Sequence, residues 1–135
     1  MSQRETVIAA MSAALVTANV ASGRVYRTRQ EAIATLPAVN IEPVSATGSD
    51  RSTGGVDERV VVAINILAKG DTPDSAADAT LNQVLTVLLS LRDLDLGDGV
   101  DIGSDYEVQW DFADFDLAQV RVLVNVHLRT WTHTL

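Results

Sequence analysis

Apolar residues alternate along an unusually long stretch in the middle of the chain, from Glu58 to Lys69. Because successive side chains of a strand point to opposite faces, this pattern predicts a β-strand. Both of its faces are largely apolar at the centre, so we expect a central strand that is covered, at least in part, on both sides. One face consists of Val60, Val62, Ile64 and Ile66.

Two other segments repeat apolar residues at the three-and-four spacing of a helix face. The first extends from Ser2 to Val20, and Ser2 with Glu5 forms a capping-box pattern at its start. The second begins at Thr72 and Pro73, an N-cap followed by a first-turn proline, and continues to about residue 92. The predicted core positions are Val7, Ile8, Met11, Leu15 and Ala18 in the first helix and Leu81, Val84, Leu85, Leu88 and Leu89 in the second.

Four more segments are predicted to be strands. A short one covers Arg24–Arg29, a second lies between the prolines of Leu36–Pro43, a third covers Asp105–Phe112 and the last alternates over Gln119–Arg129. The order is therefore α-β-β-β-α-β-β. We expect one α+β domain over residues 1–135, with a single, mostly antiparallel sheet and two principal helices packed on it.

The segment from Val44 to Val56 is polar and rich in small residues, which predicts a loop of roughly a dozen residues. Loops of that length are usually functional or mobile, although a plain hairpin connection is an equal alternative. The candidate mobile functional residues in it are Thr47, Asp50, Arg51, Gly54 and Gly55.

The amino-acid composition argues against several classes of function. The chain has 18 acidic and 10 basic residues and a formal net charge of −8, so its field repels phosphate backbones and sequence-specific nucleic-acid binding is not expected. Cysteine is absent, which excludes disulfides, thiolate metal sites and a cysteine nucleophile. No apolar run approaches the ~20 residues of a membrane span, so we expect a soluble protein made in the cytoplasm and no membrane partner.

Two clusters of opposite charge are candidate contact surfaces. Arg24, Arg27 and Arg29 lie on one predicted strand, where a solvated strand edge is the alternative. The acidic cluster resembles a calcium loop, but Asp98 occupies the position that needs glycine, so a solvated acidic loop is favoured. Its members are Asp93, Asp95, Asp98 and Asp101.

Residues that could carry chemistry are few. His127 and His133 lack a second ligand at metal-binding spacing, which favours a surface or subunit-contact role. No phosphate-binding glycine loop and no nucleophile elbow is present, so we expect no enzyme activity, metal or cofactor. Trp131 belongs to a group of aromatics near the C-terminus that predicts either a core patch or anchors of a subunit interface: Trp110, Phe112, Phe115 and Trp131.

The order of these features resembles the tail terminator proteins of long-tailed bacteriophages, the family that includes the minor tail protein U of phage lambda. The similarity covers nearly the whole chain and is diffuse, without a single diagnostic motif. The residues that carry it are the first amphipathic helix, Leu36–Ile41, Glu58–Lys69, the helix start Pro73-Asp74-Ser75, Tyr106-Glu107-Val108 and the step Asp116-Leu117-Ala118 before the last strand.

The resemblance implies a structural protein that forms a hexameric ring on the finished tail tube. Such a ring stops tube polymerisation and offers a surface for head attachment, so the implied partners are further copies of the chain, the tail tube protein and a head-completion protein of the neck. The implied location is the virion tail, after assembly in the host cytoplasm. The two charged clusters and Trp131 are then candidate interface residues, and the loop from Val44 to Val56 would face the tube or the lumen. Another head–tail joining protein and a small α/β ligand-binding domain or enzyme remain alternatives.

Overall fold

The computed structural model describes residues 3–27, 37–50, 55–70, 72–92, 100–114 and 117–131. They form two α-helices, one 3-10 turn and a single five-stranded sheet, in the predicted order with the turn as an addition. The α+β prediction is confirmed. The elements are α1 (Gln3–Thr17), η1 (Val20–Gly23), β1 (Val25–Arg27), β2 (Ala38–Asp50), β3 (Gly55–Lys69), α2 (Pro73–Arg92), β4 (Val100–Asp114) and β5 (Leu117–Trp131).

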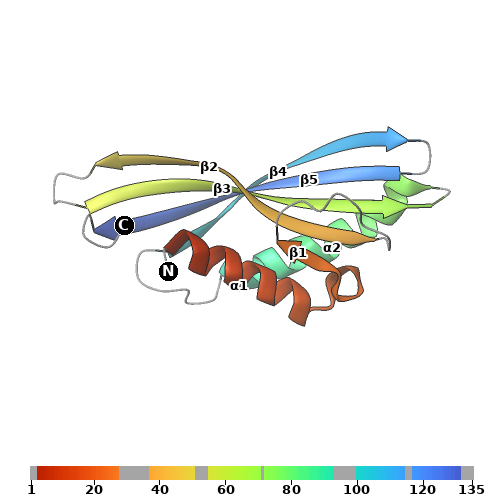
Figure 1. The fold of residues 1–135 in the computed structure, drawn as a ribbon, viewed down its shortest axis with the longest axis horizontal. Coiled ribbons are helices and arrows are strands. Elements are labelled where there is room, and N and C mark those ends of the chain that lie inside the picture. Colours follow the sequence, from red (N-terminus) through yellow and green to blue (C-terminus); the bar gives the residue numbers. More distant parts are fainter. Residues whose placement is uncertain are drawn as a thin grey trace.

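The sheet has the strand order β1-β2-β3-β5-β4. β1 pairs with β2 in parallel, and all the other pairs are antiparallel, as expected for a mostly antiparallel sheet. β3 lies at the centre, as its apolar pattern predicted, and pairs with β5 from Gly55 opposite Trp131 to Lys69 opposite Leu117. Both helices lie on the same side of the sheet (Figure 1).

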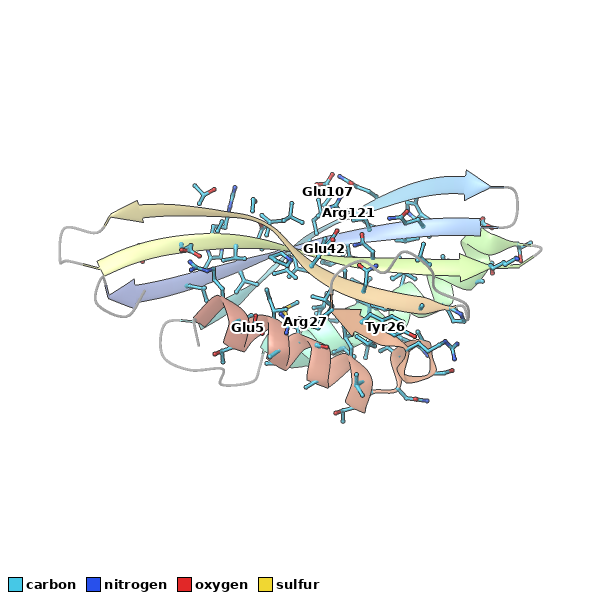
Figure 2. The ribbon with its side chains drawn as sticks, viewed as in Figure 1. Glu5, Tyr26, Arg27, Glu42, Glu107 and Arg121 are labelled. Carbon is cyan, nitrogen blue, oxygen red and sulfur yellow. The ribbon has the colours of Figure 1, made fainter. Side chains whose placement is uncertain are left out.

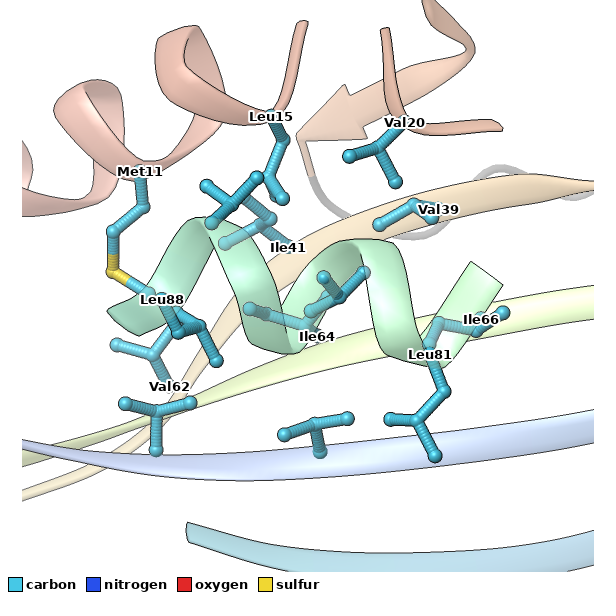
Figure 3. Close-up of a cluster of buried hydrophobic side chains, with 14 of the residues drawn as sticks. Met11, Leu15, Val20, Val39, Ile41, Val62, Ile64, Ile66, Leu81 and Leu88 are labelled. Carbon is cyan, nitrogen blue, oxygen red and sulfur yellow. The ribbon is translucent and has the colours of Figure 1, made fainter. Parts of the chain in front are cut away.

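An aliphatic core fills the space between the helices and the sheet. Met11 and Leu15 of α1 are fully buried, as is Ile64 of β3 (Figure 3). The predicted core positions are correct except at the outer ends of the two helices. Ala18 follows the last residue of α1 and is exposed, and Leu89 points outward with 54% of its surface exposed. Val87 and Leu91 are buried on the last turns of α2 together with the predicted Leu88.

The other side of the sheet carries no helix from the described part of the chain (Figure 1). Ala63 and Asn65 of β3 are nevertheless fully buried there. Within the described part of the chain, their cover comes from side chains of neighbouring strands, such as Asn40 and Glu42 beside Asn65. The expectation that β3 is covered on both sides is met in this different way.

The predicted loop from Val44 to Val56 is wrong over most of its length. β2 continues to Asp50, and its residues pair with the first part of β3. Pro43, which was expected to end the strand, instead lies at a register shift between Pro43 and Ser45. Proline is tolerated in a sheet at such irregularities and on edges, and β1 covers β2 only as far as Ile41.

The glycine-rich segment before β4 was also predicted to be a longer loop than it is. β4 begins at Val100, so Asp101 lies in a strand. A register shift between Ile102 and Tyr106 accommodates the irregular backbone there. The first helix is followed by a turn in which Asn19, Ala21 and Ser22 have positive φ, and this left-handed run reverses the chain into β1.

Candidate assembly surfaces

One edge of the sheet is basic. Arg27 ends β1, and its two terminal nitrogens donate to the two carboxylate oxygens of Glu5 at 2.9 Å (Figure 2). This hydrogen bonding lowers the pKa of the Glu5 carboxyl and raises the pKa of Arg27. Both side chains are about two-fifths exposed, at 43% and 39%. The charge of Arg27 is thus balanced inside the subunit, by a pair whose energy is small because water screens it.

Arg24 lies just before β1 and is held differently. Its Nε donates to the carbonyl of Pro37 at 2.8 Å, and its own carbonyl accepts from the Val39 N–H at 2.9 Å. A carbonyl oxygen is neutral, so this bond fixes the base of the guanidinium without balancing its charge. Arg29, the third arginine predicted for this surface, lies outside the described residues.

The opposite edge of the sheet is acidic. It is formed by β4, on which Asp101 occupies the position across from His127 of β5. The topology therefore puts Asp101 on the far side of the sheet from the arginines of β1. Asp93, Asp95 and Asp98 lie outside the described residues. All charged residues of β4 are acidic: Asp101, Asp105, Glu107, Asp111 and Asp114.

Exposed aromatic side chains accompany this acidic edge. Trp110 is 44% exposed and Tyr106 is 52% exposed, so for Trp110 the core-patch alternative is wrong. Both lie on the helix-side face of β4, because they pair with the buried Val120 and Val124 of β5. An open depression of about 380 Å³ lies between this face and the start of α2, lined by Asp74, Ser75, Asp78 and Trp110.

β2, β3 and β5 extend beyond the helices at one end of the molecule (Figure 1). Thr47 is exposed on this arm, where it pairs with Arg59, and Gly55 is brought opposite Trp131 at the arm's end. A residue of the predicted functional loop and a predicted interface residue are thus register partners there. Val44, at the base of the arm, is 46% exposed and borders a second depression of about 420 Å³ beside α1. Arg51 and Gly54 lie outside the described residues, and Asp50 pairs with Val56.

A polar network crosses the face of the sheet that no described helix covers (Figure 2). The side-chain amide of Asn65 donates to Asn40 Oδ1 at 2.8 Å and to Glu42 Oε1 at 3.1 Å. Arg121, the cross-strand neighbour of Asn65, brings its terminal nitrogen within 3.8 Å of the same Glu42 oxygen. Sequence analysis did not single out these residues. The alternation of each strand could have indicated them, because each is a polar residue at a strand position whose side chain faces away from the helices.

The described residues contain no group of three or more histidine, cysteine or acidic side chains arranged to hold a metal ion. His127 is exposed on the face opposite the helices. None of the helices described combines the length and the apolar character that crossing a membrane requires. The described residues thus present a basic edge, an acidic and aromatic edge, an arm and a polar sheet face.

Comparison with known proteins gives a clear answer only at the level of the fold. No protein-family model matches the chain, and no curated protein sequence matches it. A solved structure does. It is a chain in the virion of a native gene transfer agent particle, with a TM-score of 0.68 and 14% sequence identity. The alignment covers 90% of this chain and 91% of that one.

The two chains share a fold over about nine-tenths of their lengths. At 14% identity the likeness shows the fold alone, and it does not identify the family of the lambda tail protein U.

Proposed function

We propose that this chain is a structural protein of a phage-like virion, a tail terminator that forms a hexameric ring on the tail tube. The ring stops polymerisation of the tube and presents the surface to which the head attaches. Its partners are further copies of itself, the tail tube protein and a head-completion protein of the neck. It works through surface complementarity and performs no catalysis.

The observation that carries the proposal is the fold match to a virion chain over nine-tenths of both sequences. A match to part of a longer protein would fit many roles, because folds are shared among unrelated functions. Here the whole of a small domain has the architecture of a virion protein. The resemblance to tail terminators, found in the sequence independently of any structure, supplies the specific role.

The two edges of the sheet support the ring. A ring needs a heterologous interface, in which one surface of each subunit meets a different surface of the next. The edge with Arg24 and the edge formed by β4 are different surfaces of opposite charge, at opposite ends of the strand order. Exposed charge pairs contribute only about 0–1 kcal/mol each, so they set the register while the exposed Tyr106 and Trp110 add apolar contact area.

The test is to measure tail length and ring position. Tails assembled without the protein should show tubes of irregular, excessive length when viewed by electron microscopy. Tails assembled with the protein should have a uniform length and a ring at the end that joins the head. The oligomeric mass in solution and on purified tubes should correspond to six copies.

Charge reversal of Arg24 and Arg29 to Glu should weaken the ring and lengthen the tails. It leaves the Glu5–Arg27 pair intact, so folding of α1 against β1 is preserved. Normal tails without this protein would refute the terminator role. A ring placed elsewhere in the neck, with tube length unaffected, would establish the alternative of another head–tail joining protein.

A further inference from the structure

We propose that Trp110, Asp74 and Asp78 form a notch that receives the Arg24 guanidinium of a neighbouring copy of this chain. The notch is the depression between β4 and the start of α2. This inference rests on the proposed ring, and it names the contact that holds each copy to the next.

The exposed indole of Trp110 is the feature that indicates a contact with another surface. Val108, two residues earlier on the same face of β4, packs against the core, whereas Trp110 remains nearly half exposed beyond the edge of α2. Tryptophan is the largest apolar side chain and is enriched at the centres of protein interfaces. Together with Tyr106 it gives β4 an aromatic surface that the subunit itself does not cover.

Two carboxylates define the chemistry of the notch. Asp74 and Asp78 are four residues apart on α2, so they lie on one face of the helix, and both are exposed. The helix dipole accounts for an acid in the first turn, but not for the exposed indole beside it. An aromatic face flanked by carboxylates binds cations, and a guanidinium suits it best because it stacks on indole and donates paired hydrogen bonds to carboxylates.

Arg24 is the occupant that the topology favours. It lies at the sheet edge opposite β4, so a heterologous contact between neighbouring copies puts the two edges together. The bond from its Nε to the Pro37 carbonyl holds the side chain in place before binding, which reduces the ordering needed on contact. Arg27 is less suited, because Glu5 already binds both of its terminal nitrogens.

Side chains, and not a continuous sheet, should join the two edges. β4 has register shifts at Ile102–Tyr106 and at Phe112–Asp114, which interrupt the regular backbone pattern that another strand would require. Its acidic side chains further disfavour edge-to-edge pairing. The notch is therefore a more specific contact site on this edge than backbone pairing of β4 with another strand would be.

The decisive experiment mixes two variants that should each fail alone. Asp78→Arg reverses a charge in the notch, and Arg24→Glu reverses the charge of its occupant. Neither variant alone should form rings, as judged by oligomeric mass on purified tail tubes. A one-to-one mixture should form rings, because copies that alternate make one native interface and one with the charges exchanged. Asp78→Asn should weaken association by roughly tenfold, and Trp110→Leu should do so more than Trp110→Phe.

Glu107→Gln is the matched control. It removes one negative charge from β4 on the face away from the notch, and it should weaken ring formation much less than Asp78→Asn does. Thermal unfolding of each variant reports whether a loss of rings follows from a loss of folding. In a Trp131→Phe background, the fluorescence of Trp110 should change when rings form.

The outcomes separate this inference from the proposed function. If the unaltered chain forms rings and the variants at Asp78 and Trp110 form them equally well, the notch is not the contact, although the ring stands. If Asp78→Asn leaves the ring mass unchanged but prevents binding to the tube, the occupant belongs to the tube protein and the inference is overturned. If the unaltered chain forms no ring even on tubes, the proposed function itself fails.

Discussion

The two faces of the sheet bury the central residues of β3 by different means. Ile64 and Asn65 are neighbours in β3 and point to opposite faces, yet both are at most 1% exposed. Ile64 is covered by the two helices, within a wholly aliphatic core (Figure 3). Asn65 is hydrogen-bonded to Asn40 and Glu42 of β2, and Arg121 of β5 lies across from it on the other side.

The difference shows what each face is suited for. The helix-side face excludes water and supplies most of the stability, because burial of apolar surface is the main driving force of folding. The open face presents polar groups arranged by their own hydrogen bonds, which is the character of a solvated surface or of a wet interface.

Neighbouring residues of β3 should differ sharply when truncated. Ile66→Ala removes a fully buried side chain from the helix-side core and should lower the free energy of unfolding by about 2–5 kcal/mol. Leu67→Ala removes a half-buried side chain from the open face and should lower it by about 1 kcal/mol. Chemical denaturation of both variants measures the difference. Equal losses would mean that another part of the chain covers the open face as tightly as the helices cover theirs.

The residues of the polar network should contribute to the free energy of unfolding in a coupled way. Asn65→Ala removes the amide that donates to Asn40 and Glu42, and should lower the free energy of unfolding by about 1–3 kcal/mol because buried acceptors lose their donor. Asn40→Ala should cost less when Asn65 is already alanine. A double-mutant cycle measures this coupling, which should be about 1 kcal/mol. Additive effects would show that the two amides do not act together.

An ion pair joins the first turn of α1 to β3 at the border of the helix-side core. Arg4 of α1 donates to both carboxylate oxygens of Glu58 at 2.8 Å, and the Glu58 side chain is only 10% exposed. Arg4→Met keeps the length of the side chain but leaves the carboxylate without this partner. We expect a loss of about 1–2 kcal/mol, less than for a fully buried pair because Arg4 is 41% exposed. Adding Glu58→Gln should recover part of the loss, and failure to recover any would assign the effect to lost packing.

Sequence reasoning predicted what depends on local periodicity and missed what depends on distant partners. The alternation of β3 and β5 and the Thr72-Pro73 helix start were sufficient to place those elements. The extension of β2 past Pro43 was missed because its polar residues become a strand only through pairing with β3. Arg4 and Glu58 are 54 residues apart, so no local pattern connects them.

The candidate surfaces show the same limit. Sequence alone identified the charges of Arg24 and Asp101, but only the strand order shows that they lie on opposite edges of one sheet. The depression at Trp110 combines a strand and a helix start that are separated by about a quarter of the chain. The sequence indicates Trp110 as a candidate core or interface aromatic, whereas no local pattern connects it to Asp74 and Asp78.

The smallest expected effect concerns the exposed pair between Glu5 and Arg27. The pKa of Glu5 in the folded chain is lowered from its ordinary value of 4.5 by the hydrogen bond from Arg27. A lowered carboxyl pKa contributes stability that is present above the unfolded value and is lost as the pH falls through the folded value. Glu5→Gln should therefore be slightly less stable than the unaltered chain at pH 7 and equally stable below the folded pKa. Unfolding curves between pH 7 and pH 3 measure this convergence, and Arg27→Gln should show the same trend because it removes the other member of the pair. A gap that persists at pH 3 would show that Glu5 acts through packing of α1 and not through its charge.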